Sequence, residues 1–281
     1  MNPIGEKYLR KDSLPFIWCP GCGNGTILAA TLRAIDRLGI IDQVAFVSGI
    51  GCSSWIPVYV KADVLHALHG RTMAFGTGLK MSNPNRKIII FTGDGDCLGI
   101  GGNHFIHAAR RNLDLTVLMV NNQIYGMTGG QVAPTTPFAG KTKTSFFGNP
   151  EDPFDACELA KAAGATYIAR WTTAHPVPLS KSIAEAISHE GFSFVEVIAQ
   201  CPTQAGRLLY GISDPGAVLD LLKGKTIPVR TAQGRSREEL KGKYILGTIF
   251  QDRERMEFSR RYFQMVEKSS TDSPSPSRPP P

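Results

Sequence analysis

Two short runs of apolar residues, 87–92 and 115–120, constrain the fold of this chain more than any other feature. The first reads KIIIFT and the second LTVLMV, and continuous apolar runs of this length are typical of strands buried on both faces in a parallel sheet. Residues 103–111, between them, have the composition of a helix. Because parallel strands need a crossover connection, this succession of strand, helix and strand predicts a βαβ unit.

The same alternation continues along the chain. Further strands are predicted at residues 44–48, 166–170 and 192–198, and further helices at residues 155–163 and 177–189. The sequence therefore predicts an α/β fold, with a mostly parallel sheet and helices on both faces. Its content of 42% hydrophobic and 20% charged residues is that of a globular protein, which excludes a disordered or collagen-like chain.

The positive charge of the chain is concentrated near its C-terminus. The net charge is +7, and residues 223–268 contain twelve Lys and Arg against six Asp and Glu. A nucleic-acid-binding protein is expected to spread its basic residues over the folded part, so no nucleic-acid partner is predicted. The basic segment is interpreted either as a solvated amphipathic extension or as a docking surface for an acidic partner.

These features divide the sequence into three parts. Residues 1–205 form the main domain, residues 206–268 a basic C-terminal extension outside it, and residues 269–281 a Pro- and Ser-rich tail that is expected to be disordered. No apolar run approaches the roughly 20 residues that cross a bilayer, and the first twelve residues are charged rather than signal-like. We therefore expect a cytoplasmic protein with no membrane partner.

Four of the six cysteines lie beside glycine, proline or serine in turn-like settings: Cys19, Cys22, Cys52 and Cys201. In a reducing compartment the C-x-x-C spacing of the first two indicates metal binding or redox chemistry rather than a disulfide. Four thiolates suit a tetrahedral zinc ion or an iron–sulfur cluster. The spacing leaves both open, together with a thioredoxin-like pair or plain core cysteines, although a zinc ribbon would be expected to contain a second C-x-x-C.

Polar residues directly follow both buried strands. Gly93-Asp94-Gly95 closes the first, and Asn121-Asn122, separated from Gly95 by 25 residues, closes the second. Glycines at a strand end let the backbone approach a phosphate, and carboxylate and amide oxygens are ligands for Mg²⁺. Because ligands of parallel sheets bind beyond the carboxyl ends of the strands, both groups are expected to face one crevice that holds a diphosphate through a metal.

The pairing of GDG with NN is similar to the thiamine diphosphate motif. Together with the blocks CPGCGNG, GIGCSSW, HGR, GDGDCLGIGGNH, RRN and NNQIYGMTGGQ, it resembles the β subunits of 2-oxoacid:ferredoxin oxidoreductases, particularly the 2-oxoglutarate type. These blocks cover residues 18–136, and Cys201-Pro202 continues the match. The resemblance implies the thiamine diphosphate-binding fold, in the form of its diphosphate-binding domain.

The resemblance also implies three cofactors, namely thiamine diphosphate, Mg²⁺ and a 4Fe-4S cluster. The cluster would be held by Cys19, Cys22, Cys52 and Cys201. Magnesium would be bound by Asp94, Asn122 and the backbone carbonyl of Ile124. The coenzyme would be contacted by Ile50, Gly51, Cys52, Ser53, His69, Gly95, Asp96, Gly126 and Met127. Cys97 and Cys157 match no ligand position.

The implied activity is the coenzyme A-dependent oxidative decarboxylation of 2-oxoglutarate to succinyl-CoA with reduction of ferredoxin, or the reverse carboxylation. Pyruvate or a broad range of 2-oxoacids is the alternative substrate. A zinc-binding nucleic-acid module is the alternative of another class, but it leaves the pairing of GDG with NN unexplained. The family's usual assembly implies an α subunit that carries the pyrimidine-binding domain, in a dimer of heterodimers.

Two pairs of histidines stand three residues apart, His66 with His69 and His104 with His107. On a helix this spacing would place each pair on one face, but no carboxylate accompanies them in the spacing of metal hydrolases. His69, in the HGR block, is expected to lie against the diphosphate or the aminopyrimidine. Arg71 is expected to face an anionic group or to brace its loop, and both are candidate catalytic residues.

Overall fold

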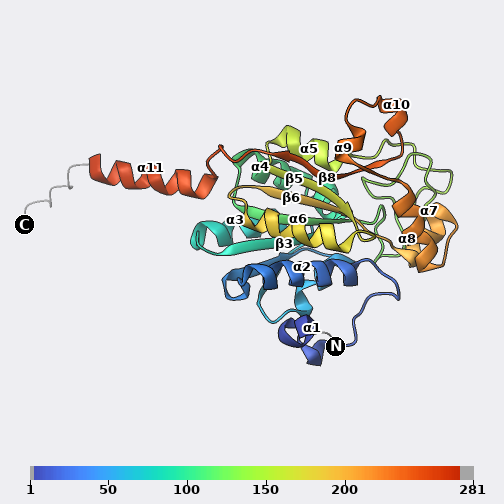
Figure 1. The fold of residues 1–281 in the computed structure, drawn as a ribbon, viewed down its shortest axis with the longest axis horizontal. Coiled ribbons are helices and arrows are strands. Elements are labelled where there is room, and N and C mark those ends of the chain that lie inside the picture. The colour runs from blue at the N-terminus through green and yellow to red at the C-terminus, as the bar shows by residue number, and fades with distance from the viewer. Residues whose placement is uncertain (1–2, 273–281) are drawn as a thin grey trace, which may run out of the picture.

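The computed structural model describes residues 3–272, which form an eight-stranded sheet with helices on both faces (Figure 1). The strands are β1 (Val44–Ser48), β2 (Asp63–His66), β3 (Lys87–Gly93), β4 (Leu115–Asn121), β5 (Tyr167–Thr172), β6 (Ser193–Ile198), β7 (Thr226–Pro228) and β8 (Tyr244–Gln251). Their order is β2-β1-β3-β4-β6-β5-β8-β7, and the first six are parallel. The predicted α/β class and all five predicted strands are confirmed.

Helices cover the sheet from both sides. The longer ones are α2 (Asn24–Leu38), α3 (Thr72–Ser82), α4 (Gly102–Arg111), α5 (Ala156–Ala163), α6 (Pro176–Ser188), α8 (Pro215–Gly224) and α11 (Phe258–Asp272). The shorter ones are α1 (Pro3–Tyr8), α7 (Arg207–Tyr210), α9 (Val229–Ala232) and α10 (Arg237–Leu240). One hydrophobic cluster joins the sheet to α2 and α6, and the other joins it to α3, α4 and α5.

Alternate residues of the central strands supply these two clusters. On β3, Ile89 and Phe91 face the cluster of α2 and α6, whereas Ile88 and Ile90 face the opposite one. Side chains of a strand point alternately to the two faces, so a strand covered on both sides must be apolar at every position. This requirement explains why the runs at 87–92 and 115–120 show no polar alternation.

Local signals set the boundaries of the helices between the strands. The Asp155 carboxylate accepts hydrogen bonds from the backbone N–H groups of Cys157 and Glu158, which caps α5. The same helix ends at Gly164, whose φ of 97° is left-handed. The predicted helix therefore has one acidic residue, Asp155, at its N-cap and a second, Glu158, in its first turn.

The C-terminal part is not the extension that the sequence predicted. β8 pairs antiparallel with β5 and parallel with β7, so residues 206–268 complete the sheet. The sequence analysis missed this strand because it lies within a segment rich in charged residues, and only Leu246 and Gly247 of β8 are buried. Helix α11 projects away from the body (Figure 1) and runs to Asp272, so residues 269–272 of the predicted tail are helical. Residues 273–281 lie outside the described part.

Within residues 3–272, every helix is too short or too polar to span a bilayer.

The opening above the sheet is set by its topology. From β1 the chain passes to β2 on one side and then to β3 on the other. Such a switch point separates the loops that follow the two strands and leaves room for a ligand at their carboxyl ends.

Candidate functional site

The loops after β1, β3 and β4 line one crevice at the carboxyl edge of the sheet. Its lining includes all nine predicted coenzyme contacts and all three predicted magnesium ligands. These twelve positions are Ile50, Gly51, Cys52, Ser53, His69, Asp94, Gly95, Asp96, Asn122, Ile124, Gly126 and Met127. The expectation that the GDG and NN motifs face the same crevice is confirmed.

Asp94 is the buried carboxylate of this crevice. Its Oδ1 accepts a hydrogen bond from the Gly95 N–H at 3.0 Å, and its Oδ2 accepts from the Gln123 N–H at 2.9 Å and from the Thr135 hydroxyl. Burial raises the pKa of Asp94 to about 6, because no full positive charge compensates the loss of water. A buried carboxylate beside the Asn122 amide fits a hard cation such as Mg²⁺.

Asp96, two residues further on, has its oxygens occupied by the protein. Its Oδ1 lies 2.5 Å from His69 Nδ1 and accepts from the Gly70 N–H at 2.7 Å, while Thr92 donates to Oδ2 at 2.6 Å. A Cβ at Gly49 would lie 2.0 Å from the same carboxylate, so this approach requires glycine. Asp96 thus fixes the imidazole ring of His69 at the wall of the crevice.

Gly95 allows a second close approach. A Cβ at this position would lie 2.3 Å from the ring of Tyr125, whose hydroxyl donates to the Gly95 carbonyl at 3.1 Å. The chain then continues as a π-helix, Gly95–Ile100, before α4 begins. Single π-helical turns are frequent at functional sites, and this one begins within the GDGD segment that lines the crevice.

The other candidate side chains lie outside the lining of the crevice. Arg71 donates to the carbonyls of Gly70 and Ile100, both at 3.3 Å, which is the bracing geometry that the sequence left as its alternative. His66 is on β2, where its Nδ1 meets the Ser48 hydroxyl at 3.0 Å. It therefore shares no helix face with His69, whereas His104 and His107 both belong to α4.

The four turn-associated cysteines come together beside the crevice. Cys19 and Cys22 precede α2, Cys52 follows β1, and Cys201 follows β6. Backbone and side-chain hydrogen bonds tie these segments together: the Gly23 N–H donates to Gln200 at 3.1 Å, and Trp18 Nε1 donates to the Cys52 carbonyl at 2.8 Å. The thiols are thus placed by three different segments of the chain.

Burial, with a smaller contribution from neighbouring thiols of the set, raises the pKa of Cys22 to about 12 and that of Cys52 to about 11. The thiols therefore lie close enough for the charge of one to affect the pKa of another. Yet among the residues described, no three of them bring their sulfur atoms within 4.8 Å of one another. Four thiolates on one zinc ion at about 2.3 Å would stand closer than this.

Gly126 is the point at which the thiols and the crevice meet. A Cβ at this residue would lie 3.6 Å from the Asn122 side-chain nitrogen, 3.6 Å from the Cys201 sulfur and 4.0 Å from the Cys52 sulfur. Cys52 also lines the crevice. The two sites predicted from separate motifs are therefore adjacent.

Several residues of the site were missed at the level of sequence. Tyr125 and Thr128 line the crevice, and Thr135 donates to Asp94. The two lining residues follow Asn122 closely and could have been inferred from their position. Thr135 lies 41 residues from Asp94, and no periodic pattern connects the two.

Comparison with known proteins places the chain among thiamine-dependent enzymes. Residues 49–197 match the family of the thiamine pyrophosphate enzyme C-terminal TPP binding domain. The 2-oxoglutarate synthase subunit KorB of Methanocaldococcus jannaschii is 50% identical, over 95% of this chain and 98% of that protein. The 2-oxoacid:ferredoxin oxidoreductase 2 subunit beta of Aeropyrum pernix is 46% identical, over 66% of this chain and 60% of that protein.

A solved structure is similar over nearly the whole chain. The 2-oxoglutarate:ferredoxin oxidoreductase of Magnetococcus marinus, with 2-oxoglutarate, coenzyme A and succinyl-CoA bound, superposes with a TM-score of 0.84 at 31% sequence identity. The match covers 95% of this chain and 90% of that chain. It therefore includes most of residues 206–268, in which the sequence motifs are sparse.

Proposed function

The chain belongs to the family of 2-oxoacid:ferredoxin oxidoreductase β subunits, and from this premise we propose how its crevice and its thiols serve the enzyme. It is the β subunit of a coenzyme A-dependent enzyme that converts 2-oxoglutarate to succinyl-CoA with reduction of ferredoxin, or carries out the reverse carboxylation. Since relatives that are 50% identical over nearly the whole chain are 2-oxoglutarate synthase subunits, 2-oxoglutarate rather than pyruvate is the substrate.

Thiamine diphosphate is the coenzyme of the crevice, in agreement with the family match. When bound, it supplies the nucleophilic carbon for the decarboxylation. We assign its magnesium ion to Asp94, Asn122 and the Ile124 carbonyl, because the buried carboxylate has only neutral donors around it. Asp96 holds His69 Nδ1, which leaves Nε2 of the ring for a proton of the coenzyme or substrate.

The four thiols are assigned to a 4Fe-4S cluster that accepts electrons one at a time. Zinc has no redox chemistry, whereas the potential of an iron–sulfur cluster is tunable over a wide range. The observation that supports this assignment is the position of Gly126, where an added Cβ would lie 3.6 Å from both the Asn122 side-chain nitrogen and the Cys201 sulfur. Electrons leaving the coenzyme would have a short distance to cross.

An α subunit completes the proposed active site. The crevice has a volume of about 130 Å³, whereas pockets that enclose a cofactor-sized molecule usually measure about 300–1,000 Å³. We propose that the partner's pyrimidine-binding domain provides the remaining wall and the substrate contacts, in a cytoplasmic dimer of heterodimers. Residues 206–268 are assigned to contact with this subunit or with ferredoxin, and Arg71 to bracing the crevice loop rather than to catalysis.

Anaerobic purification of the chain together with its α subunit tests the proposal. We expect a brown protein with broad visible absorption, about four iron atoms per chain, and thiamine diphosphate in the supernatant after denaturation. Colourless protein with one zinc ion per chain would refute the assignment of the thiols. Steady-state assays with 2-oxoglutarate, pyruvate and branched 2-oxoacids then test the substrate, and equal rates with all three would exclude a dedicated 2-oxoglutarate enzyme.

A further inference from the structure

The turn after β4 contains a residue in an unusual backbone conformation. Gln123 has a φ of 65°, in the left-handed region that few residues other than glycine, asparagine and aspartate adopt. Such a conformation persists only where the surroundings hold it. Since Gln123 lies between Asn122 and Ile124, which both line the crevice, the contacts of Gln123 determine where these neighbours point.

Two tyrosines from the C-terminal part hold the side chain of Gln123. Its Nε2 donates to the Tyr244 hydroxyl at 2.6 Å, and the Tyr210 hydroxyl donates to its Oε1. Tyr210 ends α7 and Tyr244 begins β8. Burial raises the pKa of Tyr210 to about 12, so this hydroxyl keeps its proton at neutral pH and remains a donor. We call these two residues the tyrosine clamp.

The backbone of Gln123 is held as well. Its N–H donates to Asp94 Oδ2 at 2.9 Å and to Asn121 Oδ1 at 3.1 Å, and its carbonyl accepts from the Thr136 hydroxyl at 2.7 Å. Every polar group of Gln123 therefore has a partner, and four separate segments of the chain provide these partners. This arrangement fixes the conformation of Gln123 from both sides.

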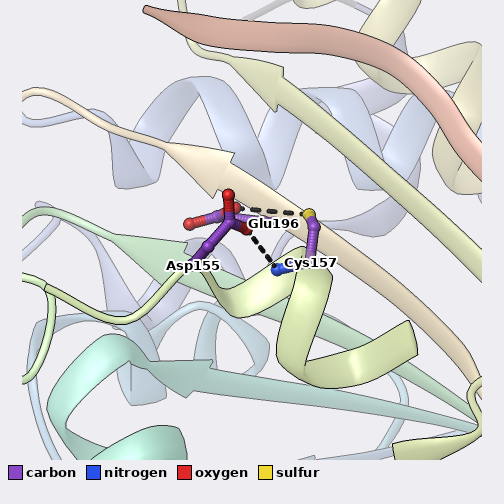
Figure 2. A group of neighbouring side chains, drawn as sticks. All are labelled: Asp155, Cys157 and Glu196. Atoms are coloured by element: carbon purple, nitrogen blue, oxygen red, sulfur yellow. Dashed lines mark hydrogen bonds between the residues drawn. The ribbon is translucent and has the colours of Figure 1, made fainter. Parts of the chain in front are cut away.

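Asn121 is itself anchored in a buried ionic cluster. Its Nδ2 donates to Glu196 Oε1 at 2.7 Å, and Glu196 Oε2 accepts from Arg170 Nε at 2.5 Å. Figure 2 shows Glu196 with Asp155 and Cys157, whose ligand atoms converge within 4.8 Å as in a metal site. However, Arg170 also donates to Asp155 at 2.5 Å, so the guanidinium supplies the positive charge there. The cluster is an anchor rather than a metal site.

We propose that the tyrosine clamp keeps Gln123 left-handed and thereby positions Asn122 and the Ile124 carbonyl for the magnesium ion of thiamine diphosphate. Tyr210 and Tyr244 are positioning residues, since they touch Gln123 and not the crevice. The inference rests on the proposed function for the identity of the ligand, but the conformational role of the clamp does not depend on that identity.

The double variant Tyr210→Phe/Tyr244→Phe removes both hydroxyl groups and keeps the rings. In the complex with the α subunit, we expect a roughly ten-fold weaker Mg²⁺-dependent binding of thiamine diphosphate, measured by calorimetry. The matched control is Tyr167→Phe, which removes another buried hydroxyl, bound to Ser182 and Glu185. We expect it to bind as the wild type does. Unchanged binding in the double variant would overturn the proposal.

A double-mutant cycle tests whether the tyrosines act through Gln123. Gln123→Gly removes the side chain that the clamp holds and accepts a positive φ without strain. In this background the two tyrosine substitutions should cause no further loss of binding. A loss that simply adds to that of Gln123→Gly would show that the hydroxyl groups act elsewhere, and the proposal would fail.

Hydrogen exchange of the cofactor-free complex separates the clamp from the proposed function. We expect the amides of residues 121–127 to exchange about ten-fold faster in the double tyrosine variant than in the wild type or in Tyr167→Phe. Faster exchange in the double tyrosine variant, together with a wild-type protein that binds no thiamine diphosphate, would support the clamp and refute the proposed ligand. Equal exchange in all three proteins would refute the clamp.

Discussion

Two groups of side chains in this protein have the composition of a metal site, and they differ in how their charge is balanced. The thiols of Cys19, Cys22, Cys52 and Cys201 form the first group, and Asp155, Cys157 and Glu196 form the second. In the second group the ligand atoms lie within 4.8 Å of one another, closer than in the first. Yet Arg170 already pairs with both carboxylates of the second group.

The hydrogen bonds of the two groups differ in the same way. Cys157 lies 3.4 Å from Glu196 Oε2, to which it donates, whereas in the described part of the chain the four grouped thiols donate no hydrogen bond. Closeness of ligand atoms is therefore a poor guide to metal binding here. A group whose charge the protein has already neutralised is closed, and one whose thiols donate no hydrogen bond is open to a ligand from outside.

The largest expected effect is the loss of iron from the open group. Replacing Cys201 by Ser should lower the iron content from about four atoms per chain to roughly none, since each thiolate holds one corner of the cluster. Cys157→Ser is the matched control, because it changes a buried cysteine of the closed group, and it should retain its iron. Iron analysis and visible absorption measure both, and equal loss in the two variants would contradict the distinction.

A smaller effect, on stability, is expected when the cation of the closed group is removed. Arg170→Met leaves the carboxylate of Glu196 buried without its cation, since the two side chains are 8% and 2% exposed. Removing one partner of such a pair should lower the free energy of unfolding by about 3 kcal/mol, measured by urea denaturation. The surface pair of Arg260 and Glu190 provides the control.

Arg260→Met should change the free energy of unfolding by less than about 0.5 kcal/mol, because exposed ion pairs contribute little. If Arg170→Met lowered the free energy of unfolding as little as this control does, the Arg170 guanidinium would not be the group that balances the charge of Asp155 and Glu196. The iron content of folded Arg170→Met protein should equal that of the wild type, because the open group does not use this cation.

The smallest expected effect is the conversion of the closed group into an open one. In the Arg170→Met variant, Co²⁺ at roughly five times its dissociation constant should restore about 1 kcal/mol of the lost stability by binding to the folded state. A cobalt–thiolate absorption band should appear and should vanish when Cys157→Ser is added. This measurement uses protein with Cys52 and Cys201 replaced by Ser, and absence of the band would contradict the interpretation.

The sequence predicted those parts of the fold in which a continuous run of apolar residues corresponds to a strand that is buried on both faces. β3 and β4 are apolar throughout, and the GDG and NN motifs at their ends identified the crevice. The strands β2, β7 and β8 were missed, because they are short or partly exposed and lack a continuous apolar run. Their pairing depends on neighbours that are distant in the sequence.

The candidate site was predictable to the extent that its residues belong to motifs. The polar contacts that support it were not, because they join residues far apart in the chain. Arg170 and Glu196 are single charges within predicted strands, and only the register of β5 against β6 shows that they are directly opposite one another. Likewise, nothing in the sequence near Gln123 indicates that Tyr210 and Tyr244 contact it.

The place of β8 in the sheet has a consequence for biosynthesis. Tyr244 lies 121 residues after Gln123, and proteins are made from the N-terminus at about 5–20 residues per second. A nascent chain therefore presents the GDG and NN loops several seconds before the strand that secures them leaves the ribosome. With the tyrosine clamp as proposed, tight uptake of the coenzyme follows the end of translation, and truncated chains that lack β8 would compete poorly for it.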